Sequence, residues 1–256
     1  MVNIGFLYYN IFLGSFDMIT EDNYNIYIEN KECLKDLIKL KASRYGSNSD
    51  IYFYKDKLLK VYNHLAYISE IKNLEIISKL NIDNVAIPRK FIYIDERFYG
   101  YSMDYKKGVI LPKINDRINY NYLITNLDKV EETIRILSNY KMEMYDINCF
   151  NILYDISNSE FNLVDIDSYR EKKYDSLEKL YKENLFSFDK SLLNCISFKY
   201  TINDNLIFNN LKNIITECIN KDITTKDTFI NIKKFLEKYG NKEINTVKDF
   251  RKILKK

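Results

Sequence analysis

The chain has 256 residues, a hydrophobic fraction of 46%, a charged fraction of 29% and a formal net charge of +3. These values are those of an ordinary globular protein, long enough for one large domain or two small ones. Its lysines are interleaved with acidic residues, so the weak net charge gives no indication of nucleic-acid binding.

Cysteine, histidine and glycine usage exclude several kinds of site. The four cysteines are far apart without a CxxC pair, and His64 is the only histidine, which argues against a zinc site. The six glycines form neither a P-loop nor a dinucleotide-binding pattern. No segment has the length and apolar character of a signal peptide or a membrane span. We therefore expect a cytoplasmic protein with free thiols and no membrane partner.

The first half of the chain is predicted to consist mainly of short strands. Residues 1–35 carry no pattern that separates an added strand pair from a dimer contact. Apolar residues at helical spacing predict a helix within residues 64–80. The β-like runs, separated by polar turns, are residues 39–43, 50–56, 57–63, 90–95 and 98–105.

The second half is predicted to be helical apart from one hairpin. Residues 122–140 place apolar side chains in steps of four and three, which predicts one long helix. Residues 151–165 predict the hairpin, and the chain from about residue 176 has helical spacing. We therefore expect a strand-rich part at 1–104 and a helical part at 105–256, with a cleft between them.

Polar residues cluster around the predicted hairpin. In "YDINCFN" (145–151) Asn151 follows Asp146 by five positions, and "VDID" (164–167) ends an apolar run with two acids. Carboxylates at the end of a buried strand are costly to desolvate unless a cation such as a metal ion lies beside them. The two segments resemble the D-x-x-x-x-N catalytic loop and the metal-binding D-F-G position of the protein-kinase-like superfamily, which includes the aminoglycoside and choline phosphotransferases.

The resemblance covers roughly residues 40–170 and implies an α+β, two-lobed, protein-kinase-like fold. Its small N-terminal lobe would hold a nucleotide-covering sheet and helix at 36–104, and its helical C-terminal lobe the catalytic hairpin. ATP and Mg²⁺ are the implied cofactors. By the same resemblance Asp146 would accept the proton of an acceptor hydroxyl, while Asn151 and Asp165 would bind the metal.

The resemblance also assigns residues of the first half to the nucleotide. Lys60 would bind the α- and β-phosphates, and strand alternation places it on one face with Leu58 and Tyr62. Its expected partner is Glu70, which shares a helix face with Leu74; Glu75 is the alternative, on the face of Lys79. The remaining positions, Gly46 and Ser47 over the phosphates and Met103, Asp104 and Lys106 around the adenine, are also assigned by resemblance.

Three function classes fit this sequence. A small-molecule phosphotransferase is favoured because Asn148 occupies the place where protein kinases usually carry lysine, and because little chain separates Asp165 from the next predicted helix. A Ser/Thr protein kinase with a shortened C-terminal lobe is the second class. The third is a pseudokinase-like nucleotide-binding or scaffold module, which the single loop glycine supports and the retained Lys60, Asp146, Asn151 and Asp165 oppose. The acceptor and the oligomeric state are not encoded in any pattern that we recognise.

Overall fold

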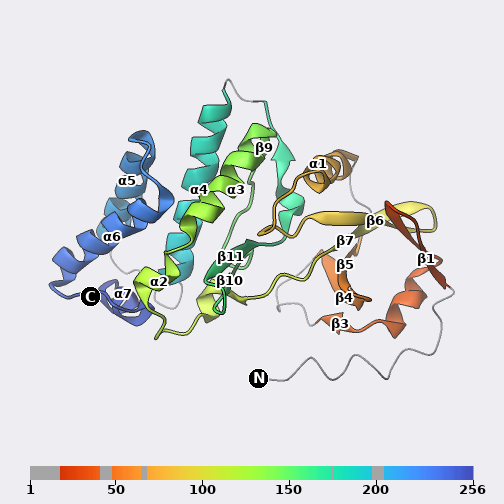
Figure 1. Ribbon diagram of the computed structural model, residues 1–256, viewed down its shortest axis with the longest axis horizontal. Helices are drawn as coiled ribbons and strands as arrows, with labels where there is room; N and C mark the ends of the chain where they lie inside the picture. The colour runs from red at the N-terminus through yellow and green to blue at the C-terminus, as the bar shows by residue number, and fades with distance from the viewer. Residues whose placement is uncertain (1–17, 41–47, 65–67, 174–175, 198–204, 256) are drawn as a thin grey trace. The chain divides into compact units, whose positions relative to one another are not determined.

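The protein is an α+β chain that forms two compact units (Figure 1). The computed structural model describes residues 18–40, 48–64, 68–173, 176–197 and 205–255, with the side chains of 68–70 and 205 excepted. One unit comprises Met1–Tyr67 and Pro88–Asp104, and the other comprises Ile68–Ile87 and Tyr105–Lys256. The sequence-based division after residue 104 placed residues 68–87 with the strands, whereas the structure groups them with the helical unit.

The strand-rich unit is built on a seven-stranded sheet with the order β1-β2-β6-β7-β5-β4-β3. Its strands are β1 Ile19–Glu21, β2 Asn25–Ile28, β3 Lys39–Leu40, β4 Ser49–Tyr54, β5 Lys57–Tyr62, β6 Pro88–Ile94 and β7 Arg97–Met103. Each predicted β-like run corresponds to one of these strands, although residues 41–43 lie outside the described part. Tight turns with Lys55, Asp95 and Glu96 in left-handed conformations close the β4–β5 and β6–β7 hairpins.

The N-terminal region contributes a strand pair to this sheet. The hairpin of β1 and β2 is antiparallel, and β2 pairs in parallel with β6 from Asn25–Phe91 to Ile28–Ile94. A short 3₁₀ helix, η3 (Lys31–Asp36), follows and is capped by the Asn30 side chain, which accepts a hydrogen bond from the Glu32 amide. The alternative of an added strand pair is therefore confirmed for residues 19–28, while residues 1–17 lie outside the described part.

Strand β5 alternates between two environments. Leu59 and Val61 are buried in an apolar cluster with residues of β1, β2, β6 and η3. Lys60 is on the opposite face of the strand, as the alternation predicted, and its side chain is only 4% exposed. Next to it, Gly100 of β7 has φ +152°, and a Cβ there would lie 1.9 Å from the Lys60 carbonyl oxygen. Only glycine therefore permits the close approach of β7 to β5 at this point.

The helical unit contains seven α-helices in its described part, and α3 packs along α4 (Figure 1). The helices are α1 Ile68–Ser78, α2 Tyr120–Leu123, α3 Leu127–Asn139, α4 Leu177–Ser197, α5 Asn205–Asn220, α6 Thr225–Gly240 and α7 Val247–Ile253. None of the helices that the structure describes is both long and apolar enough to cross a membrane.

The prediction of one continuous helix over residues 122–140 is wrong. The chain forms α2, capped by the Asn119 side chain, and a separate α3 that begins after Asn126. Asn126 has φ −104° and ψ 24°, so it interrupts the helical backbone. The predicted apolar stripe is nevertheless correct, because its residues are fully buried: Leu123, Leu127, Val130, Ile134 and Leu137.

Two small sheets complete the helical unit. The predicted hairpin is present as β10 (Ile152–Asp155) and β11 (Glu160–Leu163), and β8 (Val109–Ile110) adds a third strand to β10. A second pair is formed by β9 (Met142–Glu143) and β12 (Arg170–Glu171). Two 3₁₀ turns, η4 (Leu111–Lys113) and η5 (Ile166–Ser168), lie beside these strands in the sequence. Both ends of the segment 144–151 are thereby fixed, by β9 before it and by β10 after it.

Candidate active site

The segment between β9 and β10 is a tight polar turn that carries Asp146 and Asn151. Asp146 is exposed and has a left-handed backbone, with φ 59°. The buried Asn151 donates a hydrogen bond from Nδ2 to the Asp146 carbonyl oxygen at 3.1 Å. Asn148 closes the same turn, since its Nδ2 donates to the Asp146 carbonyl oxygen (3.1 Å) and its Oδ1 accepts from the Phe150 amide (2.9 Å). The turn therefore has a defined conformation with the Asp146 side chain exposed to solvent.

Asp165 lies at the same end of the β10–β11 hairpin as Asn151. The Val164 amide donates to the Asn151 carbonyl oxygen at 3.0 Å, directly beyond the last strand pair, Ile152–Leu163. Asp165 itself has φ 60° and ψ 52° and begins η5. The structure thus places both residues that the resemblance assigned to a metal ion at the same end of this hairpin, and the metal role itself stays a prediction.

Asp165 is exposed to solvent but lies next to a buried tyrosine. The neighbouring Tyr169 is fully buried, and burial raises the pKa of its hydroxyl. The negative charge of Asp165 raises that pKa further, because an ionised tyrosine would be repelled by the carboxylate. The carboxylate of Asp165 and the amide oxygen of Asn151 are hard oxygen donors of the kind that Mg²⁺ prefers. The bond to the Asp146 carbonyl uses the amide nitrogen of Asn151 and not this oxygen.

The strand-rich unit holds Lys60 between aromatic rings. Its ammonium nitrogen lies 6.0 Å from the centre of the Tyr62 ring and 5.9 Å from that of Tyr101. Both contacts are at the outer limit of a cation–π interaction. A buried lysine on a regular strand has restricted motion, which suits the phosphate contact that the resemblance implies.

Three further expected nucleotide-binding residues are described. Met103 is the last residue of β7, pairs with Leu58 and is 7% exposed. The Asp104 carboxylate forms ion pairs with Lys57 (2.7 Å) and Arg89 (2.6 Å). Partial burial raises the pKa of Asp104, but hydrogen bonds from those two cations outweigh burial and lower the pKa below its ordinary value.

The third of these residues, Lys106, belongs to the helical unit, where its ammonium group donates to the Asp83 carbonyl oxygen. The predicted backbone contacts of Asp104 and Lys106 with an adenine stay predictions.

Some expected residues fall outside the described part. Gly46 and Ser47 lie within residues 41–47, and the side chain of Glu70 is also not described. Glu70 does belong to α1, where Leu74 is fully buried and Glu75 is exposed. The expected solvent face of this helix is therefore confirmed at Glu75, and the pairing of Glu70 with Lys60 stays a prediction.

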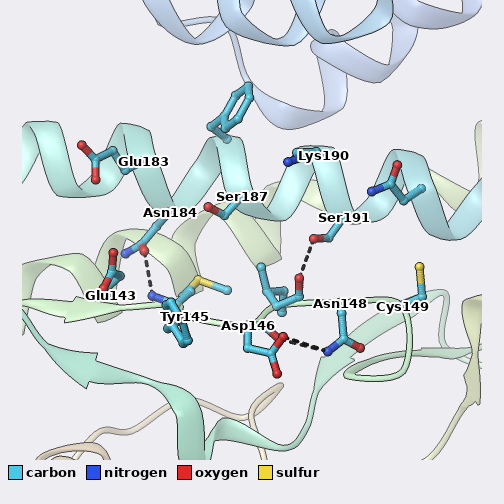
Figure 2. Close-up of a pocket in the computed structure, with 14 residues that line it drawn as sticks. Glu143, Tyr145, Asp146, Asn148, Cys149, Glu183, Asn184, Ser187, Lys190 and Ser191 are labelled. Carbon is cyan, nitrogen blue, oxygen red and sulfur yellow. Dashed lines mark hydrogen bonds between the residues drawn. The ribbon is translucent and has the colours of Figure 1, made fainter. Parts of the chain in front are cut away.

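A cavity of about 420 Å³ lies between the 143–149 segment and one face of α4 (Figure 2). Asp146 lines it from the turn, and Glu183, Asn184, Ser187, Lys190 and Ser191 line it from α4. Figure 2 shows the α4 side chains Asn184 and Ser191 reaching the turn backbone from above. This cavity lies wholly within the helical unit and places the Asp146 carboxylate at the wall of a space large enough for a small molecule.

Side chains of α4 fix the turn to the core. Asn184 is 1% exposed; its Oδ1 accepts from the Met144 amide at 2.8 Å, and its Nδ2 donates to the Met142 carbonyl oxygen and to Ser138 Oγ, both at 2.9 Å. Ser191 Oγ donates to the Ile147 carbonyl oxygen at 2.7 Å.

These α4 residues were missed from sequence. The signal that could have found them is the spacing of polar residues within the apolar stripe of this long helix. Ser191 follows Asn184 by seven positions and Ser187 by four.

Comparison with known proteins adds no relative to this picture. No family model matches the chain, and no curated protein matches it.

Proposed function

We propose that this protein is a phosphotransferase that uses ATP and Mg²⁺ to phosphorylate a hydroxyl group. A small molecule is favoured over a protein as the acceptor. The observation that carries the proposal is the grouping of Asp146, Asn151 and Asp165 around one hairpin end, with Asp146 also lining the cavity. An exposed carboxylate in a fixed turn, in one segment with two oxygen donors suited to Mg²⁺, would supply a base and a metal site.

Each residue has a distinct role in this proposal. Asp146 accepts the proton of the acceptor hydroxyl, whose oxygen forms a bond to the γ-phosphorus while the bond from that phosphorus to the ADP oxygen breaks. Asn151 and Asp165 would hold Mg²⁺, which would supply positive charge to the phosphate oxygens. By the resemblance, Lys60 would contact the phosphates through its ammonium group, and Glu70 would orient Lys60.

A short connection after Asp165 favours a small acceptor. Between Asp165 and the start of α4 at Leu177 the described chain forms only η5 and the two-residue strand β12. That strand is paired with β9 and so lies against the turn that carries the candidate base. The segment leaves little chain for a long loop that would bind a polypeptide substrate.

A transfer assay with γ-labelled ATP tests the proposal. The wild-type protein is incubated with Mg²⁺ and ATP against aminoglycosides, choline-like alcohols, sugars and generic protein substrates. We expect label transfer to a small hydroxyl compound, and loss of transfer in Asp146→Asn. The matched control is Asp95→Asn, because Asp95 is also exposed and has a left-handed backbone (φ 48°). Transfer to protein alone supports the shortened protein kinase, and nucleotide binding without any transfer supports the pseudokinase-like module.

A further inference from the structure

The segment that follows Asp165 returns to the turn that carries Asp146 and bonds to its backbone. Three residues after Asp165, the Ser168 hydroxyl donates a hydrogen bond to the Tyr145 carbonyl oxygen at 2.6 Å. That carbonyl belongs to the peptide bond that joins Tyr145 to Asp146. The orientation of the peptide bond directly before the candidate base is therefore set by the segment that begins at Asp165.

Arg170 makes two contacts with the residues before Asp146. It is the direct partner of Glu143 in the β9–β12 pair, and its Nε donates a hydrogen bond to Glu143 Oε2 at 2.7 Å. Its guanidinium carbon lies 4.0 Å from the centre of the Tyr145 ring, well within the range of a cation–π interaction. A planar guanidinium group can stack on a ring and donate hydrogen bonds from its edge at the same time. One side chain therefore holds the residues one and three positions before Asp146.

The short strand that carries Arg170 is itself held from two sides. The Glu171 amide donates a hydrogen bond to Oδ1 of Asn73 in α1 at 3.1 Å. The Lys172 ammonium group donates to Oε1 of Glu143 at 2.6 Å. The Glu143 side chain is only 16% exposed, and salt screens the ion pairs of a largely buried carboxylate less than those of an exposed one. Strand β12 is thus a fixed support from which Arg170 reaches the turn.

The two aspartates that these contacts connect have backbones that need support. Asp146 and Asp165 have φ of 59° and 60°, and a residue other than glycine stays in this region only where its surroundings determine its conformation. The Arg170 side chain is 47% exposed, and exposed ion pairs contribute little to the stability of a fold. Holding the local conformation of the turn is therefore the main effect that the Arg170 contacts can have.

We propose that Arg170 is a positioning residue that holds the turn carrying Asp146 against the segment that follows Asp165. Without its contacts, Tyr145 and the peptide bond before Asp146 lose their support on this side, and the placement of Asp146 relative to Asp165 changes. A displacement of about 1 Å in an active site lowers turnover by about 10²-fold. This consequence for turnover rests on the proposed phosphotransfer, whereas the holding of the turn does not.

Hydrogen exchange followed by mass spectrometry tests the contact on the full chain without any ligand. We expect the amides of residues 144–151 to exchange about 10-fold faster or more in Arg170→Gln than in the wild type. The matched control is Arg135→Gln, because Arg135 is also exposed and lies 4.1 Å from the centre of a tyrosine ring, that of Tyr181, and neither of them lines the cavity. Unchanged exchange of 144–151 in Arg170→Gln, or equally faster exchange in both variants, would overturn the proposal.

Two further variants test whether the effect arises from the contact between Arg170 and Tyr145. Tyr145→Leu removes the ring and leaves Arg170 in place, so its effect on exchange and that of Arg170→Gln should not add in the double variant. Arg170→Lys keeps a positive charge near Glu143 but loses the planar group, and its exchange should lie between that of the wild type and that of Arg170→Gln. Fully additive effects would show that the two side chains act separately and would overturn the proposal.

Turnover of the same variants tests the effect on the proposed reaction. In Arg170→Gln we expect kcat for phosphate transfer to fall about 10-fold or more, while KM for Mg-ATP changes less than about 2-fold and Arg170→Lys recovers part of kcat. The melting temperature should stay within about 2 °C of the wild type, because the side chain is exposed. Equal kcat in Arg170→Gln and the wild type would overturn the positioning role. If the wild type transfers phosphate to no acceptor, the proposed function fails, and the exchange experiment still decides whether Arg170 holds the turn.

Discussion

The candidate chemistry depends on residues whose backbone conformations are uncommon. Asp146 and Asp165 both have left-handed backbones, with φ of 59° and 60°. Aspartate and asparagine are the non-glycine residues that tolerate this region best, because their short side chains form local hydrogen bonds. Such residues cluster at functional sites, where the surrounding structure holds them in place. Asparagine is therefore the substitution that removes the charge at either position without changing the backbone.

We expect Asp146→Asn and Asp165→Asn to fail in different ways. Asp146 would contact only the acceptor hydroxyl, so its loss lowers turnover by about 10²-fold or more and leaves nucleotide affinity nearly unchanged. Asp165 would hold the metal, so its loss weakens Mg-nucleotide binding and turnover together. Calorimetric titration with Mg-ATP and a transfer assay on both variants, with Asp95→Asn as control, measure these effects. Equal turnover in wild type and Asp146→Asn would remove Asp146 from the mechanism.

A second residue-scale feature is the buried carboxyl group of Asp189 on α4. Asp189 is 0% exposed, and none of the described lysines or arginines forms an ion pair with it. Burial raises the pKa of Asp189 well above its ordinary value, and the nearby Thr225 hydroxyl offsets this only in part. The native state therefore keeps Asp189 protonated at a pH where the unfolded chain has lost the proton.

We expect this carboxyl group to make stability fall as pH rises. The folded-state pKa is raised, so the unfolded state loses its proton first, and unfolding becomes easier from about pH 4 upward until the folded-state pKa is reached. Asp189→Asn removes the titration and should unfold at a higher urea concentration than the wild type at pH 8, with a smaller difference at pH 4. Urea titrations at both pH values test this prediction. An equal gain in stability from Asp189→Asn at pH 4 and at pH 8 would contradict it.

At the scale of elements, α4 determines the conformation of the turn. Asn184 bonds three different segments: the end of α3 at Ser138, β9 at Met142 and the turn at Met144. All three bonds are buried, so truncation of Asn184 leaves backbone groups without partners away from water. Unmade buried hydrogen bonds cost more than the net value of the bonds themselves.

We expect Asn184→Ala to lower the free energy of unfolding by about 2–4 kcal/mol, since it leaves two buried backbone groups unpaired. The control is Asn194→Ala on the same helix, which also lines the cavity but is only partly buried, and which we expect to change stability little. Urea unfolding followed by circular dichroism gives both values. A cost for Asn184→Ala no greater than that for Asn194→Ala would show that these bonds do not stabilise the fold.

At the scale of the whole molecule, the two units differ in the charge they contribute to the proposed reaction. In the proposal, Lys60 of the strand-rich unit would contact phosphate, and Asp146, Asp165 and Asn151 of the helical unit would supply the base and the metal ligands. A cation for phosphate oxygens and hard oxygen donors for Mg²⁺ are the complementary groups that an Mg-nucleotide requires. Binding of this ligand by the native state alone should stabilise the folded chain.

We expect Mg-ATP at 100 times its dissociation constant to stabilise the protein by about 2.7 kcal/mol, which raises the melting temperature by about 5 °C or more. A thermal-shift titration measures the effect, with ATP plus EDTA and the Asp165→Asn variant as controls. Both controls should lose most of the shift, because each removes the metal or its ligand. No shift at millimolar Mg-ATP would count decisively against the nucleotide site.

The elements and residues predicted correctly from sequence are those that depend on near neighbours in the chain. Alternation in β5 set Lys60 apart from Leu59 and Val61, and the spacing of the hairpin set Asn151 beside Asp165. The division between α2 and α3 was not predicted, because the apolar stripe continues across the break and only the Asn126 backbone departs from helical geometry.

The sequence by itself determined an α+β chain with a hairpin that brings Asp146, Asn151 and Asp165 together, since all three lie within one short segment whose turns are set by local hydrogen bonds. Only the tertiary structure decided which face of α4 covers that segment. The contacts of Asn184 and Ser191 join residues 40 or more positions apart, so they depend on how α4 packs against β9 and α3. The same packing decided that Asp189 is buried and that a cavity remains beside Asp146, because burial is a property of the assembled core and is not encoded in the spacing of any one segment.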